Sequence, residues 1–501
     1  MARRVIGAVI TAVALLLAAC TSTGSPTSAS LPSGPYSKKP NIVFVLTDDL
    51  DSSLVQYMPH VIALERAGMT FTNYTVTDSL CCPSRASIFT GRFPHNTRVF
   101  SNIPPDGGFG VFYKRGEDRQ TFATALQAAG YRTALMGKYL NGYPVGNNAY
   151  NYPTDYVPPG WSTWDVVNNG YHEYNYDMNS NHTLLKYGSA GTDYLTYVLG
   201  NKAHQFIDAS AAARNPFFLE VATFSPHPPF MPAPRDRGSF AGVQAPRGPS
   251  FNRIPLHAPD WLKDRKRLSP KIVQRIDYAF QKRVAAVQSV DRMIGHLEGA
   301  LRDAGQLRNT YFVFSSDNGF HLGQHGLARG KLTAFDTDIR VPLVVAGPGI
   351  SPQSVNRDVT ENIDLAPTFE QLGGAAVPTT VDGRSLIPLL RGQHPPWRTL
   401  ALVEHHGPDR FPGDPDAQSY VDGNPPTYDA IRSPKFTYVR YANGQREYYN
   451  LAKDPAEMDN AYGSLSRARV SQLNKMVNAL ARCRGTGSCW VAGRPSYPTA
   501  P

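Results

Sequence analysis

The run PNIVFVLTDD, residues 40–49, decides the fold. Its unbroken apolar core, residues 42–46, does not alternate with polar residues, which is typical of a strand buried on both faces of a mostly parallel sheet. Two further apolar runs, residues 216–222 and 310–314, are also followed by polar residues. Ligands of open α/β sheets bind at the carboxyl ends of the strands. The three runs therefore predict one sheet edge that carries the functional side chains.

Helical patterns separate these predicted strands. Apolar residues recur at helical spacing between positions 284 and 301, and Gly305 is a plausible stop. Residues 123–129, closed by Gly130, predict a second helix, and residues 131–136 a strand that leads into Gly137-Lys138. Strands that alternate with helices predict an α/β fold, with a mostly parallel sheet flanked by helices.

Two segments do not follow this alternation. Residues 143–195 are rich in Tyr, Asn, Gly and Trp and show little periodicity, so we expect an irregular insertion over the sheet edge. Its aromatic and amide side chains suit sugar recognition, although a packed Tyr-rich loop is the commoner case. The Pro-rich residues 231–262 predict a second surface excursion.

The pattern changes after about residue 375. A continuous apolar run at 343–346 gives way to short runs at 400–403, 428–431 and 435–440, separated by turn residues. These runs predict a smaller antiparallel sheet, and a closing helix is expected near 464–482. We therefore expect a catalytic domain over residues 39–375 and a C-terminal subdomain with a closing helix and tail over residues 376–501.

The first residues predict export. Arg3 and Arg4 precede an apolar stretch, residues 5–17, that ends in Leu-Ala-Ala before Cys20. This is the anatomy of a signal peptide, residues 1–19, and the stretch is too short to span a bilayer comfortably. A Cys in this position resembles the lipidated first residue of bacterial lipoproteins; the alternative is an ordinary secretory peptide. Residues 20–38 predict a flexible tether, so we expect a lipid anchor at Cys20 on the extracellular face of the cell membrane, or secretion.

Composition narrows the class of partner. The 501 residues are 41% hydrophobic and carry 50 Lys and Arg against 40 Asp and Glu, a net charge of +10. This balance favours anionic partners such as sulfated small molecules or acidic glycans, although a basic but uncommitted surface is equally compatible with it. The sequence contains no Lys/Arg block, zinc-finger spacing or recognition-helix pattern, which disfavours nucleic acid.

The chain has five cysteines. Cys483 and Cys489 flank a Gly-rich stretch in which a small disulfide loop is plausible for an exported protein. Cys81 and Cys82 remain, and two adjacent thiols bond to each other only with severe strain. No CxxC or His-rich partner suggests zinc at these residues.

Acidic pairs follow two of the predicted strands. Asp48-Asp49 and Asp317-Asn318 would meet at one sheet edge, where their oxygens suit Ca²⁺ or Mg²⁺. Zinc is less suited because no His lies among them. Each pair taken alone could simply start a turn or cap a helix.

The run CCPSRASIFTG, residues 81–91, resembles the type I sulfatase signature C-x-P-S-R followed by a short helix and Thr-Gly. The resemblance extends along most of residues 39–460 and implies an alkaline-phosphatase-like fold with sulfuric ester hydrolase activity. In that family the cysteine matching Cys81 is oxidised to formylglycine by a formylglycine-generating enzyme. One hydroxyl of its hydrate, activated by the cation, attacks sulfur, and the other expels sulfate.

The resemblance also implies roles for individual residues. Asp48, Asp49, Asp317 and Asn318 match the family's metal ligands, joined by an oxygen of modified Cys81. Arg85 would hold the formylglycine, Lys138 and Lys331 would contact sulfate oxygens, and His227 would donate a proton to the leaving alcohol.

One departure concerns the step that regenerates the aldehyde. Many sulfatases carry a His two residues after the lysine that matches Lys138, whereas this chain has Leu140 followed by Asn141. His321 is the candidate substitute, and His321 and Asn141 are the expected substrate-binding residues. The signature together with Gly-Lys-Tyr-Leu-Asn at 137–141 is most similar to the N-acetylglucosamine-6-sulfatase branch, so a sulfated glycan or small sulfate ester is the expected substrate. The alternatives are a phosphatase or phosphonate hydrolase of the same superfamily, and a catalytically silent surface binder of sulfated glycans.

Overall fold

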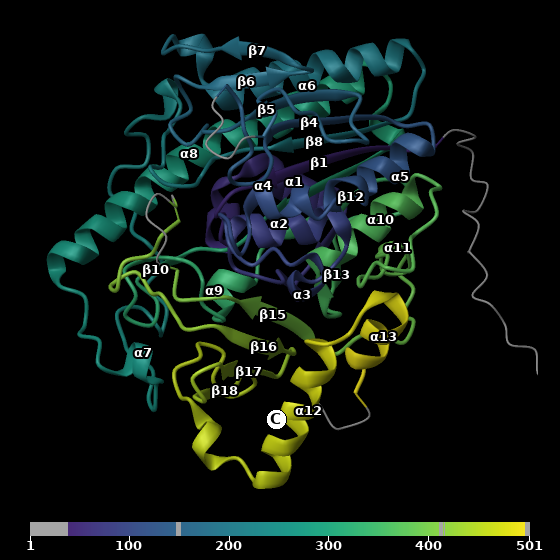
Figure 1. Ribbon diagram of the computed structural model, residues 1–501. Helices are drawn as coiled ribbons and strands as arrows, with labels where there is room; N and C mark the ends of the chain where they lie inside the picture. Colours follow the sequence, from purple (N-terminus) through teal and green to yellow (C-terminus); the bar gives the residue numbers. More distant parts are fainter. Residues whose placement is uncertain (1–38, 147–151, 410–413, 415, 496–501) are drawn as a thin grey trace, which may run out of the picture. The chain divides into compact units, whose positions relative to one another are not determined.

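The predicted strand at 40–46 lies in the middle of a ten-stranded sheet with the order β13-β2-β12-β9-β1-β8-β4-β5-β6-β7 (Figure 1). The central strands β9, β1, β8, β4 and β5 are mutually parallel, as predicted. The computed structural model describes residues 39–146, 152–409, 414 and 416–495. The strands are β1 (Asn41–Thr47), β2 (Met69–Phe71), β4 (Arg132–Lys138), β5 (Thr163–Val167), β6 (Asp177–Ser180), β7 (Thr183–Lys186), β8 (Phe217–Ala222), β9 (Thr310–Ser316), β12 (Leu343–Ala346) and β13 (Ser354–Asn356).

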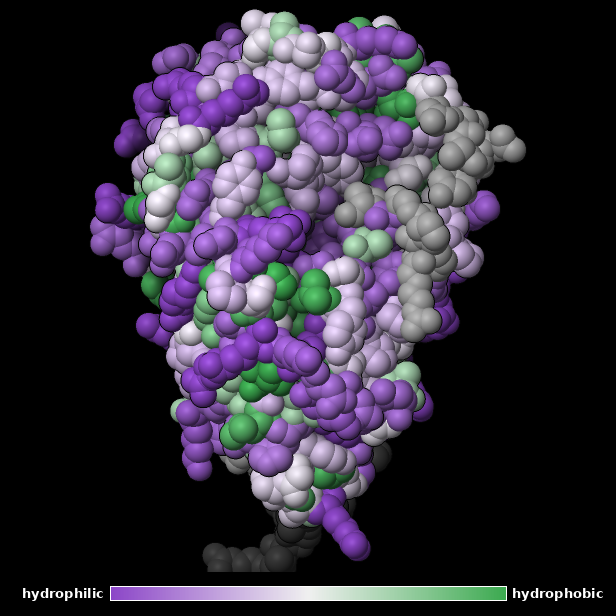
Figure 2. Space-filling view, turned by 90° about the vertical axis from the view of Figure 1, so that its left-hand side faces the viewer, coloured by the Kyte–Doolittle hydropathy of each residue, from purple (hydrophilic) through white to green (hydrophobic). Residues whose placement is uncertain are grey.

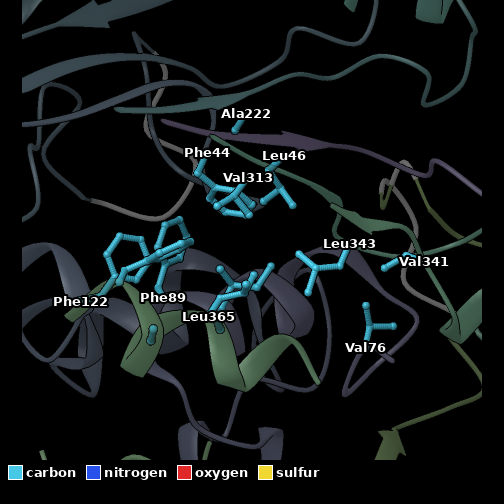
Figure 3. Close-up of a cluster of buried hydrophobic side chains, with 14 of the residues drawn as sticks. Phe44, Leu46, Val76, Phe89, Phe122, Ala222, Val313, Val341, Leu343 and Leu365 are labelled. Atoms are coloured by element: carbon cyan, nitrogen blue, oxygen red, sulfur yellow. The ribbon is translucent and has the colours of Figure 1, made fainter. Parts of the chain in front are cut away.

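Strand β1 is buried on both faces because successive side chains enter two different cores. Phe44 and Leu46 belong to the core beneath helices α2 (Cys81–Thr90), α5 (Phe122–Ala128) and α10 (Leu365–Leu372). Figure 3 shows these side chains with Val313 of β9, facing Phe89, Phe122 and Leu365 of the three helices. Val43 and Val45 belong to the opposite core, which α1 (Pro59–Ala67), α6 (Leu195–Ala212) and α8 (Pro270–Asp303) cover.

The expectation of an irregular insertion at 143–195 is wrong. Strand β5 pairs in parallel with β4, and β6 and β7 extend the sheet beyond it in antiparallel pairing. These strands carry polar residues because they lie toward the edge of the sheet, where fewer apolar side chains are needed. Helix α8 also begins earlier than its apolar periodicity indicated, at Pro270 behind the capping side chain of Ser269.

The Pro-rich segment 231–262 contains only the short helices η4 (Pro234–Asp236) and α7 (Asp260–Lys263), as expected of a surface excursion. Further short elements are the ladders β3 (Tyr74–Thr75) with β14 (Thr360–Glu361) and β10 (His321–Leu322) with β11 (Arg329–Gly330).

The predicted C-terminal sheet is present and separate from the large sheet. Four antiparallel strands, β15 (Ala401–His405), β16 (Tyr428–Arg432), β17 (Phe436–Tyr441) and β18 (Arg446–Asn450), form it in chain order. The closing helix is α12 (Arg467–Leu480), whose apolar residues share a core with this sheet (Figure 1). The boundary between a catalytic domain 39–375 and a subdomain 376–501 stays a prediction.

The expected disulfide between Cys483 and Cys489 is confirmed. The residues between them are not a loop, however, because Gly485–Ala492 form helix α13. In the part of the chain that the structure describes, no helix is long and apolar enough to cross a membrane. The predicted signal peptide, tether and lipidated Cys20 lie outside the described residues and stay predictions.

Phe369 of α10 tests the core between the sheet and its helices. Its ring lies 5.2–5.3 Å from the rings of Phe44, Phe122 and Phe218, and the residue is fully buried. We expect Phe369→Ala to lower the free energy of unfolding by about 3–5 kcal/mol, because it removes buried contacts and leaves a cavity. Val491 is 72% exposed, so Val491→Ala should change stability by less than about 0.5 kcal/mol. Urea unfolding midpoints measure both, and equal midpoints for the two variants would contradict this account of the core.

Candidate active site

Four neighbouring strands bring the predicted site residues to one sheet edge. Asp48 and Asp49 follow β1, and Asp317 and Asn318 follow β9. Lys138 is the last residue of β4, and His227 follows β8 after a short turn. All six side chains are buried, with at most 3% of their surface exposed. The edge is therefore a desolvated cluster of charges.

Helix α2 brings Cys81 to this cluster. All ten of its residues are buried, and Gly91 ends it with a positive φ of 66°. Cys81 is the first helical residue, and its Sγ lies 3.1 Å from Oδ1 of Asp48 and 3.0 Å from Nζ of Lys331. Burial raises the pKa of this thiol well above its ordinary value, and carboxylates led by Asp317 raise it further. An unmodified Cys81 is thus a protonated thiol, which is a weak nucleophile.

Arg85 lies one turn further along the same helix. Its Nε donates to Oδ2 of Asp317 at 2.7 Å, and its Nη1 donates to the carbonyl of Lys138 at 2.9 Å. Burial alone would raise the pKa of Asp317, but Arg85 and the two lysines hold that pKa below its ordinary value. Arg85 therefore links helix α2 to the end of strand β9 through an ion pair and to the end of strand β4 through a backbone carbonyl.

Each lysine contacts one carboxylate of the acidic pair. Nζ of Lys138 lies 2.5 Å from Oδ2 of Asp48, and Nζ of Lys331 lies 2.6 Å from Oδ1 of Asp49. Burial would lower the pKa of each lysine, but the neighbouring carboxylates raise it well above its ordinary value. Both side chains are therefore buried ammonium groups.

Asp416 is a member of the cluster that the sequence analysis missed. Its Oδ1 lies 2.6 Å from Nε2 of His227 and 2.8 Å from Nζ of Lys331. Its Oδ2 accepts from Nδ2 of Asn102 at 2.6 Å. Lys331 and then His227 lower the pKa of Asp416 well below its ordinary value, against the effect of burial. Asp416 lies between β15 and β16, where no apolar pattern links it to the large sheet, so only the folded structure reveals it.

The cluster fits a hard cation. Ligand atoms of Asp48, Asp49, Cys81 and His227 all lie within 4.8 Å of one another. Oδ2 of Asp49 and Oδ1 of Asn318 are buried without a hydrogen-bond partner, which is costly unless something else satisfies them. Carboxylate and amide oxygens are preferred ligands of Ca²⁺ and Mg²⁺. These orphaned atoms support the predicted cation at this edge.

The two expected substrate-binding residues differ in their surroundings. Asn141 donates to the hydroxyl of Tyr171 at 3.3 Å, and its Oδ1 is buried without a partner. His321 contacts Asp338 through Nδ1 at 3.0 Å and the carbonyl of Asp422 through Nε2 at 2.6 Å. Because both ring nitrogens of His321 are engaged, the structure does not present it to a substrate in this state. The roles of both residues stay predictions.

Comparison with protein families identifies the family of the chain. The sulfatase family matches residues 40–375, and the family described as N-sulphoglucosamine sulphohydrolase, C-terminal, matches residues 323–484. The first match contains every residue of the cluster except Asp416, which lies in the second. The chain therefore belongs to the sulfatase family, and it is a sulfuric ester hydrolase.

Individual relatives confirm the predicted resemblance to N-acetylglucosamine-6-sulfatases. The chain is 34% identical to N-acetylglucosamine-6-sulfatase of Homo sapiens, over 89% of this chain and 85% of that protein. It is 35% identical to the extracellular sulfatase SULF-1 homolog of Drosophila melanogaster, over 74% of this chain and 33% of that protein. A protein solved in complex with its substrate D-glucosamine-2-N,6-O-disulfate shares the fold. Its TM-score is 0.73 at 24% identity, over 88% of this chain and 97% of that one.

Calcium binding tests the cation site without any activity measurement. We expect Ca²⁺ to raise the thermal unfolding midpoint of chelator-treated protein, since a ligand at 100 times its Kd stabilises the folded state by about 2.7 kcal/mol. Asp49→Asn should lose most of this Ca²⁺-induced rise, because it removes a buried carboxylate from the cluster. Asp264 is exposed, so Asp264→Asn is the matched control and should keep the rise. An equal rise in both variants would place the cation elsewhere.

Proposed function

We propose that this enzyme removes the 6-O-sulfate of glucosamine units in sulfated glycans, with Cys81 as the precursor of its nucleophile. The observation that carries the proposal is the position of Cys81, at the start of α2 and in contact with both Asp48 and Lys331. The similarity to three N-acetylglucosamine-6-sulfatases, over 78–85% of their length, supports the choice of substrate class.

The proposal gives Cys81 a role only after its oxidation to formylglycine by a formylglycine-generating enzyme. The hydrated aldehyde supplies the hydroxyl that attacks sulfur, and the divalent cation supplies charge to activate it. Asp48, Asp49, Asp317 and Asn318 would hold the cation together with the modified side chain. Water is consumed overall, and the products are sulfate, the free alcohol and a proton.

The cationic side chains hold and neutralise the sulfate. Lys331 contacts Cys81 directly, and Lys138 contacts Asp48, which in turn contacts Cys81. Charge that builds on sulfate oxygens in the transition state is stabilised by such fixed donors. Arg85 keeps the modified residue in place, because its guanidinium is held by Asp317 and by the carbonyl of Lys138.

His227 is suited to give a proton to the leaving oxygen. Its Nδ1 donates to the carbonyl of Pro228 at 2.8 Å, which leaves Nε2 facing the cluster. A histidine whose other nitrogen is fixed in this way presents one defined atom to the substrate. Asn141 completes the proposal as a substrate-binding residue, because its Oδ1 is buried without a partner. His321 would bind substrate, or assist the step that regenerates the aldehyde, only after its contacts with Asp338 and the carbonyl of Asp422 were broken.

The contacts of Asp416 support a position for the sulfate group of the substrate. Its carboxylate contacts Nζ of Lys331 and Nε2 of His227 at once, so this point accepts a negatively charged oxygen. We propose that a sulfate ester takes this point and displaces Asp416. The N-terminal sequence supports export with a lipid anchor at Cys20, or secretion, and a sulfated glycan outside the cell would be within reach in either case.

The central experiment compares the two adjacent cysteines. We expect Cys81→Ala to abolish release of sulfate from N-acetylglucosamine-6-sulfate, because the attacking group is lost. Cys82→Ala is the matched control and should retain turnover, since Cys82 lies in the apolar core. Mass analysis of the tryptic peptide that ends at Arg85, from protein made in its native host, should find formylglycine at position 81.

Several results would contradict the proposal. Full activity of Cys81→Ala, or a wholly unmodified Cys81 in active protein, would exclude the mechanism. Faster hydrolysis of an aryl phosphate than of the matching aryl sulfate would favour a phosphatase or phosphonate hydrolase. Binding of a sulfated glycan without any release of sulfate would favour a silent surface binder.

Asp416→Asn tests whether this carboxylate marks the sulfate position. Removing its charge leaves Lys331 and His227 without their competing anion, so we expect the KM for a small aryl sulfate to fall. The expected change is on the order of tenfold, because a hydrogen bond to a charged group is worth about 1.5–3 kcal/mol. Steady-state kinetics and competition by inorganic sulfate measure it. An unchanged KM with a large loss of kcat would show that Asp416 positions catalytic groups instead.

A further inference from the structure

A groove runs outward from the cluster along helix α8. A cavity of about 500 Å³ begins at His227 and is walled by Tyr171, Phe230 and the first half of α8. A second cavity, of about 360 Å³, adjoins it and shares Tyr278 and Lys282 of α8. We call these two cavities together the α8 groove. Cavities of about 300–1,000 Å³ suit ligands of small-molecule size, so the groove has room for more than one sugar unit.

The charges that line the α8 groove have one sign. Lys282 lies where the two cavities meet, Arg329 lines the first cavity, and Arg237 lines the second. None of the described lining residues is acidic, and none of these three side chains forms an ion pair with a described carboxylate. Elsewhere in the described structure buried or half-buried arginines are commonly paired, as Arg292 is with Asp236 at the same helix. Lys282 and Arg329 lie over the rings of Tyr278 and Phe230 instead. Cations without a carboxylate partner in a concave site favour an anionic ligand.

The remaining lining suits a sugar. Tyr278 stands at the junction with 61% of its surface exposed, and Tyr171, Phe230 and Phe240 add further aromatic faces. Figure 2 shows that the side of the molecule on which α8 lies in Figure 1 is largely hydrophilic, with hydrophobic residues in small separate groups. Such a surface offers no broad apolar patch for a protein partner. Aromatic faces beside cations instead match the apolar rings and acidic groups of a charged glycan.

We infer that the α8 groove binds a second anionic group of the substrate, carried by the sugar unit next to the one that loses its sulfate. The inference rests on the proposed function, because the first sugar must enter the cavity at His227. Lys282 and Arg237 would contact the sulfate or carboxylate of the neighbouring unit, and Tyr278 would pack against its ring. The preferred substrate is then a polyanionic oligosaccharide rather than a sulfated monosaccharide.

Substrate selectivity tests the inference. The measurement is the ratio of kcat/KM for a 6-sulfated disaccharide that carries a second sulfate or a carboxylate to kcat/KM for N-acetylglucosamine-6-sulfate. We expect a ratio of at least about ten in the wild type, from one or two charge-assisted contacts. Lys282→Gln and Arg237→Gln should each lower this ratio about three- to tenfold and weaken its dependence on salt.

Lys271→Gln is the matched control, because Lys271 is exposed on the same helix and lines neither cavity. It should leave the ratio at the wild-type value. A ratio near one in the wild type, an unchanged ratio in Lys282→Gln and Arg237→Gln, or an equal fall in Lys271→Gln would overturn the inference. Comparing the sulfated and the carboxylated disaccharide identifies which anion the groove prefers.

Calorimetric binding separates this inference from the proposed function. The Cys81→Ala variant should bind the anionic disaccharide more tightly than the monosaccharide, and Lys282→Gln in that background should remove most of the difference. This result would support the groove even if wild-type protein released no sulfate. Equal affinity for both ligands in the Cys81→Ala variant would overturn it, whatever the activity of the wild type.

Discussion

Buried charge at the carboxyl edge of the central sheet constrains the rest of the structure. Four carboxylates meet three permanent cations and one histidine there, all almost without exposed surface: Asp48, Asp49, Asp317 and Asp416 against Arg85, Lys138, Lys331 and His227. Charges removed from water are tolerated only when partners neutralise them at close range. The strands, the helix and the loops that carry these residues therefore have to hold them in fixed positions, and the two cores on either face of β1 supply that rigidity.

The balance of positive and negative charge in the buried site also explains why Asp416 fits the cluster. It brings one negative charge to Lys331 and His227, and a sulfate ester brings one as well. Exchange of one for the other would leave the net charge of the buried site unchanged. An anion of higher charge, such as a phosphate monoester dianion, would disturb it, and this favours the sulfatase chemistry of the family over the phosphatase alternative.

Much of the fold was predictable because its strongest signals are local. The apolar runs of β1, β8 and β9 indicate buried strands, and the helical spacing of apolar residues in α8 indicates a helix. Because the strands are parallel, the residues that follow them lie at one edge of the sheet. Strand β5 was missed because its short run lies among tyrosines, asparagines and glycines, whose composition is that of a loop. The pairing of β5 with β4 depends on contacts between residues far apart in the sequence, and the local sequence pattern does not reveal such contacts.

The site was predictable to the same extent and for the same reason. Cys81, Arg85 and the residues after β1 and β9 stand in short motifs, and the structure brings them together. Asp416 and Arg237 do not stand in any recognisable sequence motif. They lie in segments outside the regular elements, and only the folded structure brings Asp416 to the cluster and Arg237 to the α8 groove. His321 shows the converse, since its motif is local but both its nitrogens are taken up by Asp338 and a backbone carbonyl.

The burial of helix α2 has a consequence for the order of events in the life of the protein. Cys81 has no exposed surface, and every other residue of helix α2 is buried as well. An enzyme that oxidises this side chain could not reach it once the sheet and the helices had closed around it. Under the proposed function, maturation therefore competes with folding: a chain that folds before it meets the modifying enzyme is stable but permanently inactive. The supply of active enzyme would then depend on the timing of export as much as on the amount of protein made.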